Sequence, residues 1–154
     1  MAITLFIYLL AIVSWLGSMI FFIVTTATIF GALPLHEAGK VLSQLFPRYY
    51  LLGYIAGFVA SLLAIYFAFA HPRIWWALAS LCLVAALALT LYAGVIIRPQ
   101  VDAIRTVNEE PNPDPARKAE FDRLHQLSVR LNGAVIALNL VALLSTATAL
   151  TRYV

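Results

Sequence analysis

The chain has 154 residues, of which 63% are hydrophobic and 11% are charged, and its mean hydropathy is +0.92. A soluble domain of this size needs more charge to cover its surface, so the composition excludes an ordinary soluble globular protein. The formal net charge of +3 does not indicate a nucleic-acid partner, because the basic residues lie at the ends of apolar runs and in loops. Orientation signals of membrane proteins have that distribution.

Four charge-free runs, residues 1–35, 49–70, 74–97 and 131–151, predict membrane-spanning helices at approximately residues 3–33, 49–70, 74–97 and 129–151. Each run is long enough to cross the hydrocarbon core, which takes about 20 helical residues. The backbone has no water to bond inside a bilayer, so each open span must be helical. No basic residue precedes the first run, and it exceeds the apolar region of a signal peptide, so we expect a retained helix. The sequence predicts an all-α integral membrane four-helix bundle in one domain, residues 1–154.

Small residues predict where the first two spans pack closely, because helices in lipid associate through small side chains. The second span places three of them four residues apart. The first span places small residues beside a tryptophan. The predicted packing residues of both spans are Trp15, Gly17, Ser18, Gly53, Gly57 and Ser61. Such faces can pack helices together within one bundle or between two copies of the chain. We expect a homo-oligomer.

The segment LPLHEAGKVLSQLFP, residues 33–47, connects the first two spans. Its apolar residues recur at helical spacing, at Leu35, Ala38, Val41, Leu42 and Leu45. That pattern predicts a short amphipathic helix lying on the membrane surface. The second span then begins behind it.

Residues 98–130 are the longest polar stretch, and they predict a helical hairpin between spans three and four. The stretch QVDAIRTVNEE is followed by a break at PNPDP. Asp114 is a preferred N-cap residue and Pro115 suits the first helical position, so a helix should begin there and run into the fourth span. A proline-rich tip would join its two arms.

Lysine and arginine predict the orientation. Eight of them lie in the first connection and the hairpin, whereas the opposite side has Arg73 and Arg152. By the positive-inside rule the 98–130 hairpin is cytoplasmic and both termini lie outside.

The fourth span carries a polar stripe at alternating steps of three and four residues: His125, Ser128, Asn132, Val135, Asn139, Ala142 and Thr146. Such a stripe should face the bundle rather than lipid. In one interpretation Asn132 and Asn139 form interhelical hydrogen bonds that hold the bundle together. In the other, the cytoplasmic half of the stripe lines a pocket. Both can hold at different depths.

A ring of polar residues is expected at the cytoplasmic boundary, and it is the candidate ligand-binding site. Its members are Arg48, Tyr49, Arg98, His125, Ser128 and Asn132. Guanidinium groups that face the bundle could bind an anion, for which an anionic lipid headgroup is the leading candidate. The alternative is that Arg48 and Arg98 extend to the membrane surface and only mark the interface.

Four segments resemble the transmembrane protein 205 family and its bacterial relatives of unknown function. They are WLGSMIFF, LFPRYY, RPQVDAI and LHQLSVRLNG, and they occur in all four spans in the same order. The resemblance implies a four-span protein, here in a bacterial inner membrane, with no established activity. It marks Trp15, Gly17, Phe46, Pro47, Tyr49, Arg98, Pro99, His125, Ser128 and Asn132.

The predicted function is a multi-pass membrane protein that binds or helps to transport a small molecule, ion or lipid. The charge-free runs lack the buried ionisable residue that proton-coupled carriers usually have, which disfavours a stand-alone transporter. An enzyme is not expected, because His125 and Ser128 lack a complete catalytic arrangement. A structural or partner-docking protein is the first alternative. The second is a haem or metal protein using His36 and His125, but their spacing matches no metal signature, so no cofactor is predicted.

Overall fold

A computed structural model of the chain describes residues 1–110 and 114–151, and this part is helical apart from short connections. In chain order the elements are α1 (Ala2–Ala32), α2 (Leu35–Ala70), α3 (Ile74–Leu91), the π-helix η1 (Tyr92–Ile97), α4 (Arg98–Ile104), the 3₁₀-helix η2 (Arg105–Glu109) and α5 (Pro115–Thr151). The spans Ala2–Ala32, Leu35–Ala70, Ile74–Val107 and Pro115–Thr151 are long and apolar enough to cross a membrane. The predicted four-helix membrane bundle is confirmed. Arg152 and the centre of the proline-rich tip, residues 111–113, lie outside the described residues.

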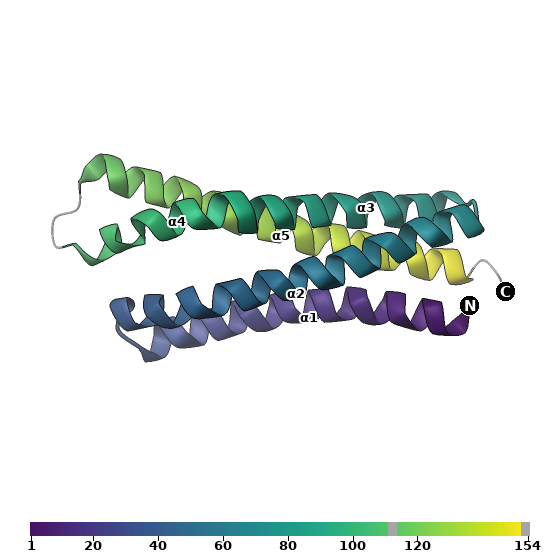
Figure 1. Ribbon diagram of the computed structural model, residues 1–154, viewed down its shortest axis with the longest axis horizontal. Coiled ribbons are helices and arrows are strands. Elements are labelled where there is room, and N and C mark those ends of the chain that lie inside the picture. The colour runs from purple at the N-terminus through teal and green to yellow at the C-terminus, as the bar shows by residue number, and fades with distance from the viewer. Residues whose placement is uncertain (111–113, 152–154) are drawn as a thin grey trace.

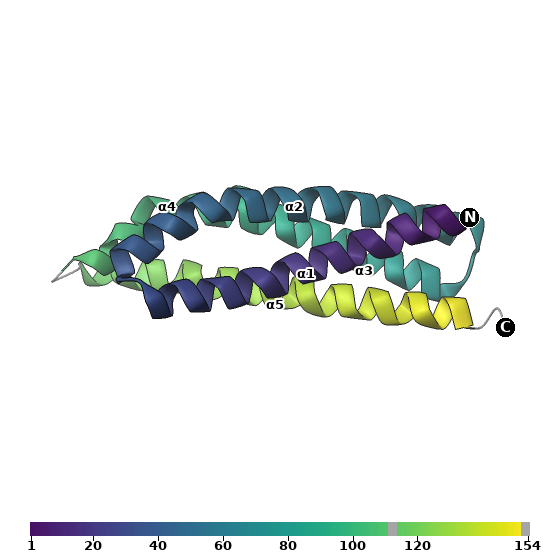
Figure 2. The same ribbon diagram turned by 90° about the horizontal axis from the view of Figure 1, so that it is seen from below.

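The bundle is elongated, and its two ends differ (Figures 1 and 2). The start of α1 and the end of α5 lie at one end, which we call the terminal end. The hairpin formed by α4, η2 and the start of α5 projects at the other end, which we call the hairpin end. In Figure 1, the α1–α2 pair and the α4–α5 pair diverge toward the hairpin end. The bundle is therefore splayed at the hairpin end (Figure 1); its middle, where the helices pack on one another, is called the closed part, and a cavity of about 250 Å³ lies at the terminal end.

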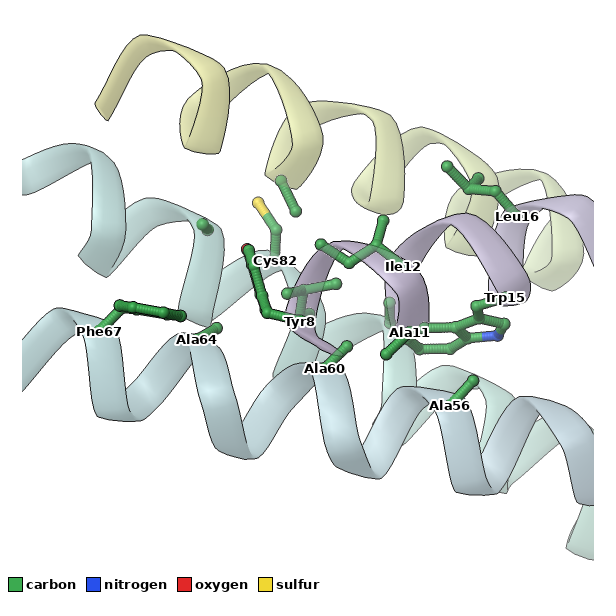
Figure 3. Close-up of a cluster of buried hydrophobic side chains, with 14 of the residues drawn as sticks. Tyr8, Ala11, Ile12, Trp15, Leu16, Ala56, Ala60, Ala64, Phe67 and Cys82 are labelled. Atoms are coloured by element: carbon green, nitrogen blue, oxygen red, sulfur yellow. The ribbon is translucent and has the colours of Figure 1, made fainter. Parts of the chain in front are cut away.

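The first half of α1 fills the closed part of the core. Tyr8, Ile12 and Trp15 are almost completely buried there, and Figure 3 shows them beside the alanines of α2. The Tyr8 hydroxyl lies 2.7 Å from Thr146 Oγ1 on α5, and Thr146 itself donates to the Ala142 carbonyl, so Tyr8 donates to Thr146. This bond ties the first helix to the last across the core.

The small residues of α2 are used inside this chain. A Cβ added at Gly57 would lie 2.8 Å from Trp15 Cη2, and one at Gly53 would lie 3.4 Å from Trp15 Nε1. Ser61 is also buried. Because Trp15 occupies this face, the face gives the expected homo-oligomer no support.

Two predicted packing residues of α1 behave differently. A Cβ added at Gly17 would meet no atom within 4 Å, so Gly17 is not at a helix contact within the chain. The Ser18 hydroxyl donates to the Trp15 carbonyl of its own helix, at 2.7 Å. The expected packing of Gly17 within the bundle is corrected, because Gly17 lies on the exposed side of α1, away from the face that Trp15 presents to α2, while a contact of Gly17 between copies stays a prediction.

The predicted surface helix at residues 33–47 is also corrected, since α2 begins at Leu35 and continues through Pro47 without a break. Ala38 and Leu42 are buried instead of facing a membrane surface. A Cβ added at Gly39 would lie 3.4 Å from an Arg105 nitrogen, so this first part of α2 packs beside the hairpin. Leu35 and Val41 of the same predicted pattern stay exposed.

The predicted start of the last helix is confirmed. The Ala116 N–H donates to Asp114 Oδ1 at 3.2 Å, and α5 runs from Pro115 to Thr151. The basic residues near this start have acidic neighbours: Arg117 pairs with Glu110, Lys118 with Asp122, and Arg123 with Glu120. The hairpin thus neutralises much of its own charge.

Candidate functional site

A cavity of about 570 Å³ lies where the helices diverge at the hairpin end. Within α1, all of which the structure describes, no residue after Met19 is buried. Phe22, Ile23 and Phe30 of this half face Val129 and Ile136 of α5 across the cavity. These side chains make two of its walls apolar. The cavity is partly open rather than enclosed, as a gap between two diverging helices should be.

A smaller compartment of about 170 Å³ continues the cavity toward the hairpin. Thr26, Phe46, Asp102 and His125 line both compartments. Arg105 lines only the smaller one. The site is therefore a groove with an apolar part between α1 and α5 and a polar part beside α4.

Arg98 is the cation of the larger compartment. Its Nη2 lies 3.1 Å from Asp102 Oδ2, one helical turn later, and its side chain is 23% exposed. The guanidinium carbon lies 5.8 Å from the centre of the Phe46 ring, which is within cation–π range. Arg98 Nε is buried and has no hydrogen-bond partner among the described residues. The arginine is held in place while one donor stays unused.

Pro47 contributes to the position of Arg98 through the backbone of α2. A proline has no N–H, so the Ser43 carbonyl, four residues earlier, lacks its usual helical partner. Arg98 Nη2 donates to that carbonyl at 3.4 Å. The prolines of LFPRYY and RPQVDAI lie on either side of this contact. The hydrogen bond between Arg98 and the Ser43 carbonyl connects α2 with α4.

The helix that presents Arg98 is locally widened. Residues Tyr92–Ile97 form a π-helix, and the Arg98 N–H donates to the Ala93 carbonyl, five residues earlier. A Cβ added at Gly94 would collide with the Tyr54 hydroxyl and the Tyr50 ring, so only glycine fits beside these tyrosines. π-Helical turns occur often at functional sites because the extra residue changes the direction of the side chains that follow. In this helix, Arg98 and Pro99 are the residues that follow the π-helical turn.

Aromatic and amide groups form the floor of the groove. The Tyr49 hydroxyl donates to Asn132 Oδ1 at 3.2 Å, which joins α2 to α5. The Tyr50 side chain is buried and close enough to Ser128 and Asn132 to interact with both. The His125 ring stacks on Phe121, with 5.9 Å between ring centres. Tyr50, Ser128 and Asn132 thus line the cavity together.

The structure brings four of the six predicted site residues together, since Arg98, His125, Ser128 and Asn132 all line the cavity. Tyr49 reaches it through its bond to Asn132. Arg48 is exposed and does not line it. Arg48 therefore stays with the interpretation in which it only marks the membrane interface.

Sequence reasoning missed Thr26, Tyr50 and Asp102. Asp102 could have been found, because an acidic residue four positions after Arg98 suggests an ion pair on one helix face. Thr26 gave no signal that separates it from the other threonines of the first span. Its Oγ1 is buried and has no hydrogen-bond partner among the described residues.

The stripe on α5 divides in two, as its two interpretations allowed. Val135, Asn139, Ala142 and Thr146 are buried in the core, whereas the part before Val135 lines the groove. Asn139 corrects one expectation, because its Nδ2 donates to the Val135 carbonyl of its own helix and its Oδ1 has no partner among the described residues. In the buried half of the stripe an interhelical bond is made by Thr146 with Tyr8, two turns after Asn139.

The haem or metal alternative gains no support from the described part of the chain. There, no group of three or more His, Cys, Asp or Glu side chains could hold a metal ion. His36 does not line the compartments that His125 lines. The expected absence of a cofactor stays a prediction.

One comparison with known proteins gives a match. A family model described as a domain of unknown function (DUF4149) matches residues 10–110, which include Thr26, Arg98 and Asp102 but end before α5. No curated protein and no solved structure matches the chain. These results do not support the narrower resemblance to the transmembrane protein 205 family, which stays an expectation.

Proposed function

The chain belongs to the DUF4149 family, whose shared domain is of unknown function, and we propose that it binds an amphiphilic molecule from the membrane in the groove between α1 and α5. The observation that carries the proposal is the combination of apolar walls with a held arginine in one cavity of about 570 Å³. Binding sites for small molecules typically pair mainly apolar walls with a few placed polar groups.

The open side of the groove supports a ligand that comes from lipid. The second half of α1 has no buried residue and packs on α2 through Phe22, which stacks on Tyr49 and lies against Phe46, whereas α1 contacts α5 far less than it contacts α2. An apolar tail can therefore enter between α1 and α5 without an opening of the core. The polar part of such a ligand would lie beside α4, near the boundary where headgroups are expected.

Binding is better supported than passage across the membrane by one copy of the chain. The core beyond the groove is filled by large side chains, with Trp15, Trp76 and Tyr8 almost completely buried. Large buried side chains at the centre of the bundle obstruct a continuous path for a solute. The partner-docking alternative has less support, because Arg117, Lys118 and Arg123 of the hairpin already pair with acidic neighbours.

Two glycines provide a matched test. A Cβ at Gly133 or at Gly17 would meet no atom within 4 Å, but only Gly133 lines the cavity. The variant Gly133→Phe should fill the groove and reduce the lipid that stays bound in native mass spectrometry of the protein purified in mild detergent. The variant Gly17→Phe should leave bound lipid unchanged. Equal retention in the wild type and both variants would show that the groove is not the binding site.

A further inference from the structure

We infer that the ligand has an anionic, oxygen-rich headgroup, which Arg98 Nε and Thr26 Oγ1 bind from opposite sides of the groove. This inference rests on the proposed function and specifies the chemical class of the ligand. Its central observation is that two buried donors without partners line the same cavity. A buried polar group that lacks a hydrogen bond destabilises the fold, so such groups in a cavity indicate where a ligand atom belongs.

Thr26 differs from several hydroxyl groups of this bundle, and Ser61, whose Oγ also has no partner among the described residues, does not line the cavity. Thr28 in the same helix donates to the Val24 carbonyl, and Thr90 in α3 donates to the Ala86 carbonyl, each four residues earlier. That local bond is the common way for a hydroxyl group to satisfy itself inside a membrane helix. Thr26 Oγ1 is buried without any partner among the described residues. Its hydroxyl is therefore available to donate into the groove.

Arg98 supplies the second donor and the charge. Its Nη2 is engaged by Asp102 and by the Ser43 carbonyl, which leaves Nε as a fixed donor. An N–H of a guanidinium binds phosphate or carboxylate oxygens more strongly than neutral acceptors. Because the side chain is already held by Asp102, Ser43 and Phe46, little further ordering is needed when a ligand binds.

The charged residues that line the groove favour an anionic ligand. Its two compartments have two guanidiniums, Arg98 and Arg105, against one carboxylate, Asp102, among the charged residues that line them. A single negative charge on the ligand would balance this excess. The apolar walls between α1 and α5 then fit an acyl tail, so the occupant is an anionic membrane lipid rather than a free anion.

The test compares two lipids with identical eight-carbon chains, dioctanoyl phosphatidylglycerol and dioctanoyl phosphatidylcholine, titrated against the purified protein in native mass spectrometry. The wild type should bind the anionic lipid about 10-fold or more tightly than the zwitterionic one, because both headgroups have a phosphate but only phosphatidylglycerol keeps a net negative charge to balance the excess of guanidiniums. The variant Arg98→Gln should remove most of this preference, whereas Arg98→Lys, which keeps the charge but not the Nε donor, should weaken the binding of both lipids and keep the preference. Thr26→Val should reduce affinity for the anionic lipid about 2-fold to 10-fold, whereas Thr26→Ser, which keeps the hydroxyl, should not.

The outcomes separate this inference from the proposed function. If both lipids bind equally and Gly133→Phe abolishes the binding of both, the headgroup assignment is overturned and the binding function stays intact. Binding that Gly133→Phe does not change would overturn both. Inorganic phosphate is the third probe: if it displaces phosphatidylglycerol at similar concentration, the site recognises a free anion and the lipid assignment is wrong. Unchanged thermal unfolding of each variant controls for misfolding.

Discussion

Replacement of Gly57 by alanine is the sharpest test of how the closed part of the bundle is packed. The new Cβ would lie 2.8 Å from Trp15 Cη2, 3.0 Å from Trp15 Cζ3 and 3.1 Å from Leu87 Cδ1. Ordinary contact begins at 3.4 Å, so the nearest ring atom would have to retreat by about 0.6 Å. Trp15 is 1% exposed, and a rigid indole in a filled core has no free space into which it can move.

The magnitude follows from a comparison with Gly17→Ala. Both variants gain whatever alanine gains over glycine in a helix, about 0.8–1 kcal/mol in aqueous hosts. Only the methyl group at position 57 overpacks a core, which typically costs about 1–3 kcal/mol. The difference between the two variants cancels the shared helix effect. We therefore expect Gly57→Ala to be less stable than Gly17→Ala by about 1–3 kcal/mol. Gly53→Ala, whose Cβ would meet Trp15 and Thr90 at 3.4 Å, should lie between them.

Unfolding in mixed micelles as the fraction of sodium dodecyl sulfate rises measures this difference, with tryptophan fluorescence and circular dichroism as independent signals. The predicted order of stability is Gly17→Ala, then Gly53→Ala, then Gly57→Ala. If Gly57→Ala were as stable as Gly17→Ala, the close contact between α1 and α2 would be refuted.

Three further predictions concern the same bundle. Tyr8→Phe should lower stability by about 0.6–2 kcal/mol through loss of its bond to Thr146, and a double-mutant cycle with Thr146→Val should show that the two effects are not additive. Cys82 is buried, so a maleimide should label it far more slowly in the native bundle than after unfolding in dodecyl sulfate, and equal rates would contradict its placement. A cysteine placed by Ala116→Cys in a Cys82→Ala background should react with an impermeant maleimide only from the cytoplasmic side, and labelling of intact cells from outside would reverse the predicted orientation.

The sequence predicted the architecture because the constraints that fix it are local. A charge-free run of about 20 residues in a bilayer has little choice but to form a helix. The start of α5 was equally readable, since Asp114 and Pro115 act within one turn. By contrast, nothing local shows that α2 continues through Pro47, because that depends on the contact of its first turns with the hairpin.

The candidate site was only partly predictable for the same physical reason. Arg48 and Arg98 both flank an apolar run, and their sequence surroundings do not separate them. The structure separates them, because a π-helical turn precedes Arg98 and the Ser43 carbonyl accepts a hydrogen bond from it, whereas Arg48 is exposed. The position of Thr26 at the cavity depends on the divergence of α1 from α5, which is a property of the whole bundle.

The position of a bound amphiphile tests the central claim most directly. A lipid with a photoactivatable group in its acyl chain should cross-link, in liposomes that contain the protein, to peptides of α1 and α5 that include Phe22–Phe30 and Val129–Ile136. An excess of unmodified lipid should remove these cross-links. Exposed residues of other faces, such as Phe69, Leu81 and Leu144, should show only the weak labelling that unmodified lipid does not compete away. Labelling that is uniform over all these faces, or that competitor leaves unchanged at the groove, would contradict the account.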